Sequence, residues 1–214
     1  MAISALRTLS RNLGAAAGGL RLGPTQRFEI DRNRALLTST VMPVIDRYTG
    51  VLYEALDAES LPPAARAFAR NHLLIHSALF GLLRALDPIP VYRLSHDSRL
   101  PGLSLRKHWS APVSQVLAEQ PGLILDLRSE SYVALGPAPE SSWYVRVVSA
   151  DGPEDGSGRR PALTHFNKKA KGQFTRAVLE AGIDHRDPES LLGWAAREGI
   201  RLFIGVPGEL NLVV

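Results

Sequence analysis

The 214-residue sequence has no cysteine and only four lysines, while its other twenty-one basic side chains, histidine aside, are arginine. The absence of cysteine excludes disulfides, thiolate zinc sites and a cysteine nucleophile, and it fits a reducing cytoplasm. No apolar run is long enough for a secretory signal or a membrane span. We therefore expect a cytoplasmic protein without a membrane partner.

The lysines are gathered instead of being spread along the chain. Three of the four fall in one tetrapeptide, as Lys168, Lys169 and Lys171. No Asp or Glu occurs between Gly156 and Leu179, a stretch that also contains three arginines, Arg159, Arg160 and Arg176. This concentration of positive charge marks the place where an anion would bind.

The local pattern predicts a strand-to-helix junction at these lysines. The apolar segment 161–166 is typical of a short strand, and Asn167 is a good N-cap for a helix that stops at Gly182. The lysines would then occupy the first turn, where the helix dipole disfavours cations by roughly 0.3–1 kcal/mol each. A solvated basic turn is the alternative. Because the lysines are placed against the dipole, we favour phosphate binding, helped by the backbone N–H groups of the helix start.

The overall composition predicts one domain with a modest positive charge. Hydrophobic residues make up 45% of the chain, the formal net charge is +4 and the sequence pI is about 9.7. Such a charge suits a polyanionic partner without demanding one. The first 28 residues contain four arginines and no acid, a composition shared with transit peptides. The alternative, which we prefer, is a surface helix or a ragged N-terminus.

Strand and helix patterns alternate along the rest of the chain and predict an α/β fold, a mixed sheet with flanking helices. Strands are predicted over residues 72–77, 122–127, 143–150, 161–166, 200–206 and 209–214. Helices are predicted over residues 78–86, from 129 to 135, from 167 to 182 and from 188 to 198. The last of these has Asp187 as its cap and Pro188 in its first position. The two strands that flank residues 151–160 are expected to form a hairpin.

Polar or basic side chains follow three of the predicted strands, at the point where each strand ends. They are Ser77, then Arg128 with Ser129, then Asn167 with the lysines. In open α/β sheets, ligands bind beyond the carboxyl ends of the strands, so these residues would meet in one cleft. The alternative is that they are ordinary loop residues at strand ends that do not meet.

Residues 100–117 contain a candidate hairpin for recognition of a nucleic-acid backbone. A Leu-Pro-Gly turn precedes an amphipathic helix, and the segment contains or adjoins Arg99, Arg106 and Lys107 without any acid. Hairpins of this kind present glycine N–H groups to phosphate and do not read sequence. Because Ser104 stands where a second glycine is usual, a plain turn into a core helix is the alternative.

Other chemistry finds little support. His72 and His76 have the spacing of a helical metal pair, but they fall in a predicted strand and no third ligand is apparent. No P-loop, dinucleotide fingerprint or nucleophile elbow occurs. We therefore predict no metal, no cofactor and no identified catalytic residue.

Five features of the sequence form a recognisable set. They are residues 48–56 (YTGVLYEAL), residues 77–94 (SALFGLLRALDPIPVYRL), Trp109, residues 126–132 (DLRSESY) and residues 165–172 (HFNKKAKG). In order and spacing they resemble the YaaA peroxide-stress protein family, over residues 23–203. The matching positions are Tyr48, Thr49, Gly50, Ser77, Gly81, Leu82, Arg84, Asp87, Tyr92, Arg93, Ser129, Tyr132, Lys168, Lys169 and Gly172.

The resemblance implies a cytosolic bacterial protein of mixed α/β fold. Such a protein would bind double-stranded DNA through a basic cleft and a helix-hairpin-helix-like element, and would limit peroxide damage by keeping free iron low. Two departures matter. Ala85 stands where the family usually has proline, and the chain lacks the apolar first strand, with its lysine-containing turn, that opens family members. We therefore expect a fragment, with a helical but poorly packed segment over residues 1–23 and a single domain over residues 24–214.

Two functions are compatible with these residues. The first is a monomeric DNA-binding protein, whose phosphate contacts would be Lys168, Lys169, Lys171, Asn167, Arg84, Arg93, Arg128, Ser129, Ser77, Arg106 and Lys107. The second is an enzyme that acts on a small phosphorylated or nucleotide substrate, in a pocket lined by Ser77, Arg93, Ser129 and Lys168. A wide groove would favour the first function, and a deep pocket holding a carboxylate would favour the second.

Overall fold

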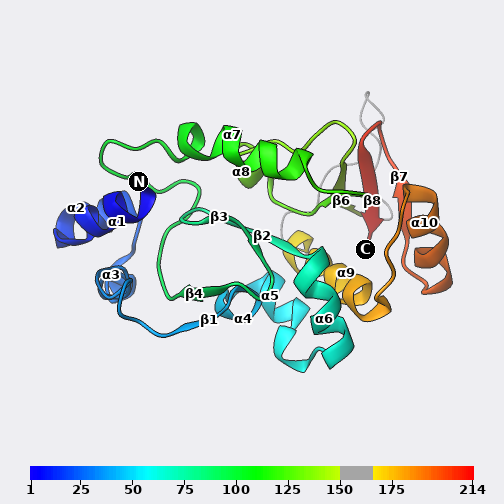
Figure 1. Cartoon of the computed structure of the whole chain (residues 1–214), viewed down its shortest axis with the longest axis horizontal. Coiled ribbons are helices and arrows are strands. Elements are labelled where there is room, and N and C mark those ends of the chain that lie inside the picture. The colour runs from blue at the N-terminus through cyan, green and yellow to red at the C-terminus, as the bar shows by residue number, and fades with distance from the viewer. Residues whose placement is uncertain (150–165) are drawn as a thin grey trace. The chain divides into compact units, whose positions relative to one another are not determined.

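The computed structural model describes residues 1–149 and 166–214 (Figure 1). Its contacts divide the chain into two compact units. The first unit comprises Met1–Arg47, Arg70–Leu117 and Arg128–Pro137, and the second comprises Tyr48–Ala69, Ala118–Leu127 and Ala138–Val214. Each unit is therefore assembled from three separate stretches of chain, whereas the sequence predicted one domain beginning at residue 24.

The first unit begins with helices that contribute to its hydrophobic core. They are α1 (Ala2–Ser10), α2 (Leu13–Gly19), the 3-10 helix η1 (Pro24–Gln26) and α3 (Glu29–Arg34). Asn12 caps α2, because its side chain accepts a hydrogen bond from the N–H of Ala15 at 2.9 Å. Leu6, Ala16 and Leu20 are fully buried in this core. The segment 1–23 is helical, as predicted, but it is packed and not loose.

Two small antiparallel sheets belong to the same unit. β1 (Val41–Pro43), which is followed by the short helix α4 (Val44–Arg47), pairs with β4 (Pro88–Pro90), and β2 (Leu74–Ser77) pairs with β3 (Gly81–Arg84). The helix predicted over residues 78–86 is therefore wrong. The Ser77 hydroxyl accepts hydrogen bonds from the N–H groups of Leu79 and Phe80, and Gly81 adopts a φ of +78°. Together they turn the chain back into β3.

The first unit also contains α7 (Leu105–Ala118) and α8 (Glu130–Val133). A tight turn precedes α7, in which the N–H of Leu103 donates to the carbonyl of Leu100 at 3.3 Å. Gly102 adopts a φ of +65° in this turn, a conformation that glycine accepts at little cost. Residues 91–104 contain no helix. The predicted turn is thus present, while its part in a helix-hairpin-helix element stays a prediction.

The second unit is built on a four-stranded sheet in the order β5–β6–β8–β7. Its strands are β5 (Leu125–Asp126), β6 (Trp143–Val148), β8 (Glu209–Val213) and β7 (Leu202–Ile204). β5, β6 and β8 are parallel, and β7 is antiparallel to β8. Alternate residues of β6 and β8 are buried against Phe174 of α9 (Asn167–Ala181) and Trp194 of α10 (Pro188–Arg197). These two helices therefore pack on one face of the sheet.

The sequence predicted the C-terminal end of α9 and the start of α10 correctly. Gly182 ends α9 with a φ of +60°, as predicted. The Asp187 carboxylate accepts a hydrogen bond from the N–H of Ser190 at 2.7 Å, and Pro188 takes the first position of α10. Both signals are local to the chain, which explains why they could be read without tertiary information.

Three further elements lie between β1 and β2 in the chain: α5 (Val51–Leu56), the 3-10 helix η2 (Ala58–Ser60) and α6 (Pro63–His72). The α/β class is confirmed, with three small sheets among the described residues in place of one mixed sheet. Within residues 1–149 and 166–214, no helix is long and apolar enough to cross a membrane. The strand predicted over residues 161–166 and the hairpin that it would complete fall outside the described residues.

Candidate anion-binding site

The start of α9 presents two of the predicted lysines to solvent. Lys168 and Lys169 are the second and third residues of the helix, both are exposed, and the first turn contains no acid. Phe166 is the capping residue, and Asn167 is already helical, so the predicted Asn167 cap is wrong by one position. No side chain caps the first turn of this helix, so the lysines lie beside backbone N–H groups that add partial positive charge.

Lys171 does not belong to this exposed surface. Its side chain is 3% exposed, and its Nζ atom lies 4.7 Å from the centroid of the Tyr144 ring. Residues 170, 171, 172 and 174 form the buried face of α9, so this lysine follows the helical period into the unit. Lys171 is thus the buried one of the three lysines, and their contact with phosphate stays a prediction.

Gly172 places α9 directly against α5. A Cβ atom at Gly172 would lie 2.2 Å from the carbonyl oxygen of Leu52 and 2.9 Å from the Cβ of Ala55. Only glycine permits so close an approach of two helix backbones. Residues 48–56 and 165–172, two of the segments that carried the family resemblance, are thus brought together although more than a hundred positions separate them in the chain.

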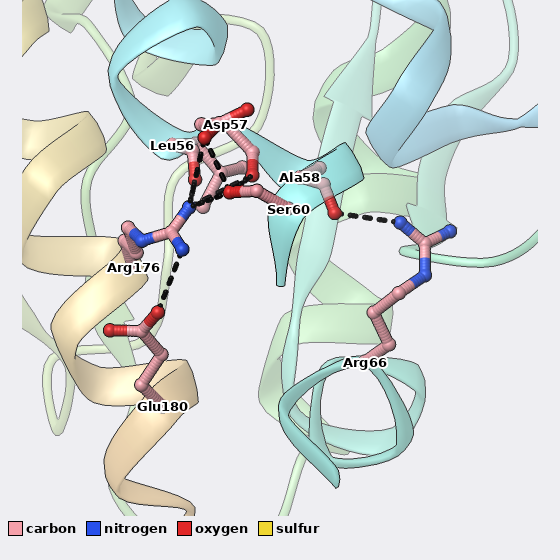
Figure 2. Close-up of polar contacts among 7 residues, drawn as sticks. All are labelled: Leu56, Asp57, Ala58, Ser60, Arg66, Arg176 and Glu180. Carbon is pink, nitrogen blue, oxygen red and sulfur yellow. Dashed lines mark hydrogen bonds and ion pairs between the residues drawn. The ribbon is translucent and has the colours of Figure 1, made fainter. Parts of the chain in front are cut away.

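Arg176, one turn further along α9, closes the other end of this contact. Figure 2 shows its guanidinium pointing at the end of α5, where Nη1 donates to the carbonyls of Leu56 at 3.0 Å and Asp57 at 2.9 Å. The same nitrogen lies 2.9 Å from Ser60 Oγ, while Nη2 pairs with Glu180 at 2.8 Å. A cation at a helix C-terminus complements the dipole. Arg176 therefore stabilises the α5 end and is not one of the exposed cations.

The contacts show that α5 and α9 run in the same direction. Leu52 faces Gly172, and Leu56 faces Arg176. The start of α5, at Val51, therefore points toward the same end of the pair as Lys168. Two helix starts and two exposed lysines lie at this end of the second unit, where the first turn of α5 contains Glu54 and that of α9 contains no acid.

The start of α7 repeats the pattern in the first unit. Arg106 and Lys107 are its second and third residues, both are exposed, and the first turn has no acid. The hydroxyl of Ser104 accepts a hydrogen bond from the N–H of Lys107 at 3.4 Å, and the carbonyl of Ser104 accepts one from the N–H of His108 at 2.9 Å. Ser104, which sequence reasoning treated as a departure from a hairpin pattern, thus caps the helix.

All four lysines of the chain therefore lie within the first five residues of α7 or α9. The sequence associated Lys107 with an amphipathic helix after the Leu-Pro-Gly turn, and the structure makes it the third residue of α7. Three of the four are exposed, and these lie at the second or third position of their helix.

Ser77 has a structural role in the first unit. It is 1% exposed, and its hydroxyl lies 2.6 Å from the Tyr92 hydroxyl while accepting the two backbone hydrogen bonds that shape the turn into β3. It does not precede a helix, contrary to the sequence interpretation. A buried hydroxyl with three partners is not available to a phosphate group.

Arg128 takes part in a half-buried polar and aromatic cluster of the first unit. Its Nη1 donates to the carbonyl of Gly136 at 2.9 Å and lies 3.2 Å from His76 Nδ1. The Tyr132 ring centroid is 5.3 Å from that of His76 and 5.5 Å from that of His96. Residues 126–132 of the family resemblance thus contact His76 and His96, which flank segment 77–94, while Ser129 is the exposed residue that precedes α8.

The two other arginines of the predicted site differ in their contacts: Arg84 bonds through its side chain and Arg93 through its backbone. Arg84 is exposed, and its guanidinium donates to the carbonyl of Asn71 at 3.3 Å. Arg93 is half-buried, and its backbone N–H and carbonyl form hydrogen bonds of 2.7 and 2.9 Å with the side chain of Asn33. Asn33 is fully buried. Sequence reasoning missed it, because the contact joins residues 60 positions apart.

The predicted residues are divided between the two units. Ser77, Arg84, Arg93, Arg106, Lys107, Arg128 and Ser129 belong to the first unit, and Asn167, Lys168, Lys169 and Lys171 belong to the second. The single cleft predicted from strand ends therefore stays a prediction. Among the described residues, no group of three histidine or acidic side chains is arranged to hold a metal ion.

Known sequences resemble most of this chain. A family model described as peroxide stress protein YaaA matches residues 4–200. A UPF0246 protein of Corynebacterium glutamicum strain R is 41% identical over 179 residues, which cover 81% of this chain and 69% of that protein. A UPF0246 protein of Streptomyces coelicolor is 41% identical over 180 residues, covering 81% of this chain and 66% of that protein. The chain thus spans about two thirds of the length of these relatives.

Proposed function

The chain belongs to the peroxide stress protein YaaA family, and from that membership we propose that it binds the phosphate backbone of double-stranded DNA in the cytoplasmic response to peroxide. The protein would act as a monomer and would contact backbone and shape without reading bases.

One observation carries the proposal: each unit has a long helix that starts with two exposed cations and no acid. The pairs are Arg106–Lys107 on α7 and Lys168–Lys169 on α9. Cations at these positions oppose the helix dipole and cost stability, by roughly 0.3–1 kcal/mol each. An anionic partner would reverse that cost, because it would meet lysine ammonium groups and helix N–H groups together.

The openness of these cations favours a polymer over a small molecule as the partner. Lys168, Lys169, Arg106 and Lys107 are all exposed. Exposed cations suit a backbone that runs over a surface, whereas small-molecule sites bury most of their ligand.

A salt titration tests the proposal. The full chain is titrated onto a short mixed-sequence DNA duplex, with the expectation of a dissociation constant of about 10⁻⁴ to 10⁻⁶ M at physiological salt. Because counterions are released, log K should fall linearly with log salt, and duplexes of different sequence should bind equally. Binding that does not depend on salt, or no binding at low salt, would reject the proposal.

The proposal also includes a lower level of free iron in the cell, which the family resemblance implies. Its support is that resemblance alone, so it needs a measurement of its own. Chelatable iron should rise in peroxide-stressed cells that lack the gene and fall again when the gene is restored. An unchanged iron level would reject this part and leave DNA binding standing.

A second candidate is an enzyme that acts on a small phosphorylated or nucleotide substrate. The observation that favours it is the half-buried cluster in which Arg128, His76, His96 and Tyr132 meet. Such groups are able to bind an anion and move a proton. Turnover of simple phosphomonoesters or nucleotides that is lost in His76→Gln, with the fold intact, would support it.

A further inference from the structure

The end of α2 packs directly against the segment that precedes α7. The N–H of Arg99 donates to the carbonyl of Gly19, at the end of α2, over 2.7 Å. A Cβ atom at Gly19 would lie 2.8 Å from the carbonyl oxygen of Arg99, so glycine is needed for this approach. Leu20 and Leu100 are buried in one hydrophobic cluster. The turn at residues 100–103 is therefore supported by α2.

Arg21 extends this contact with a charge interaction. Its Nη1 atom lies 3.1 Å from the Asp97 carboxylate, and the two side chains are 56% and 34% exposed. Arg21 reaches this position from a left-handed backbone conformation, with a φ of +53°, which is uncommon for a residue with a side chain. This conformation ends α2, because the N–H of Leu22 donates back to the carbonyl of Ala17 at 2.9 Å.

Asp97 is itself held in place. The Ser95 hydroxyl donates to its carboxylate at 2.5 Å. This hydrogen bond, followed by smaller effects that include His96 and Arg21, lowers the pKa of Asp97 below its usual range. The carboxylate is thus negatively charged at neutral pH.

The charge of Asp97 matters because of its neighbours in the chain. It is the only acid between Asp87 and Glu119, a stretch that contains Arg93, Arg99 and the Arg106–Lys107 pair. Within the first unit, Pro101 and Gly102 at the tip of the turn are exposed, and no other atom lies within 4 Å of the Cβ position of Gly102. An unpaired carboxylate beside this turn would repel a phosphate chain.

We propose that Arg21 is a positioning residue of the nucleic-acid surface around α7. Arg21 pairs with Asp97 and so neutralises the one negative charge in the segment that approaches the phosphate backbone. The N-terminal helices then serve DNA binding by delivering this arginine. The inference rests on the proposed function, because it names a residue of the first unit that would strengthen DNA binding.

A double-mutant cycle with Arg21→Ala and Asp97→Asn tests it, using the full chain and a short mixed-sequence duplex at low salt. Arg21→Ala exposes the carboxylate, so binding should weaken about two- to fivefold, the range expected for a solvent-exposed charge pair. Asp97→Asn alone should bind at least as well as the wild type. The double variant should recover wild-type affinity, because no carboxylate is left to neutralise.

A matched ion pair provides the control. Arg32 and Glu29 on α3 form a pair of 2.9 Å in the same unit, and the variants Arg32→Ala and Glu29→Gln should leave DNA affinity unchanged. Melting temperatures of all variants establish that each chain is folded.

The outcomes separate the inference from the function on which it rests. If the wild type shows no salt-dependent binding, the proposed function fails. If the wild type binds and Arg21→Ala binds equally well, the inference fails alone. A double variant as weak as Arg21→Ala would also overturn it, because Arg21 would then contact phosphate directly.

Discussion

Gly172 of α9 lies against the carbonyl oxygen of Leu52 in α5, at a distance that leaves no room for a Cβ atom. The two segments come from opposite halves of the sequence, and each carries part of the family resemblance. Their contact fixes where α9 starts relative to α5, and so determines where Lys168 and Lys169 reach solvent. A single glycine therefore links the packing of the second unit to its candidate anion site.

Gly172→Ala should destabilise the protein by about 1–3 kcal/mol, because the added methyl group forces two helix backbones apart. Denaturant unfolding measures the change. Gly18→Ala in α2 is the matched control, since nothing lies within 4 Å of its Cβ position. That control should be neutral or stabilising, by up to about 1 kcal/mol. Equal stability of Gly172→Ala and the wild type would contradict the close contact.

Replacing Lys168 and Lys169 together with alanine should flatten the salt dependence of DNA binding by about 1 to 2 units of slope, since each lost phosphate contact removes about 0.9. The double replacement of Arg197 and Arg201, two exposed cations away from any helix start, is the control for net charge. An unchanged slope in the lysine variant would exclude the start of α9 from the DNA interface.

Lys171→Ala should change the stability of the protein and leave the salt dependence of DNA binding unchanged. Its ammonium group is buried over the Tyr144 ring, so the replacement should lower stability by roughly 0.5–2 kcal/mol through the lost cation–π contact. The salt slope of DNA binding should stay at the wild-type value. A flatter slope with unchanged stability would show that Lys171 reaches phosphate after all.

Ser77→Ala should lower stability by about 1–3 kcal/mol, because the N–H groups of buried Leu79 and half-buried Phe80 lose their acceptor and Tyr92 loses a partner. Ser129→Ala, at an exposed position whose side chain caps nothing, should change stability by less than about 0.5 kcal/mol. Thermal unfolding of the two variants measures the difference. Equal melting temperatures would contradict the structural role of Ser77.

Stability should fall as the pH drops through the histidine range. Burial, the largest cause, lowers the pKa of His185 below its usual value of 6.5, with Asp184 and Asp187 acting against it and Arg197 with it. The unfolded chain then binds a proton more readily than the folded chain, so the stabilising contribution is complete above about pH 6.5 and is lost below it. His185→Gln should flatten this pH dependence of the free energy of unfolding.

A His185→Gln variant that retains the full wild-type slope between about pH 7.5 and 5.5 would locate the titrating group elsewhere.

Some elements of the chain were evident from sequence because their determinants are local. Asp187 and Pro188 begin α10, Gly182 ends α9, and the alternating apolar residues of β6 and β8 form strands as expected. The placement of cations is local as well, so the lysines at the start of α9 could be identified without a structure.

Other features depended on contacts between distant residues. Residues 78–86 are good helix formers, yet Ser77, Gly81 and pairing with β2 make them a turn and a strand, because tertiary interactions outweigh helix propensity. The same is true of the N-terminal helices, whose apolar side chains fill a core that no short pattern shows.

The sequence by itself determined the family, the α/β class, the C-terminal end of α9, the start of α10 and the presence of a basic helix start. Tertiary structure alone decided which of those cations face water, since Lys168, Lys169 and Lys171 differ only in their position around the helix. It also decided that Arg176 caps α5, that Ser77 is buried and that Arg21 meets Asp97. Burial and ion pairing depend on residues far apart in the chain, whereas caps and periodicity are set within a few positions.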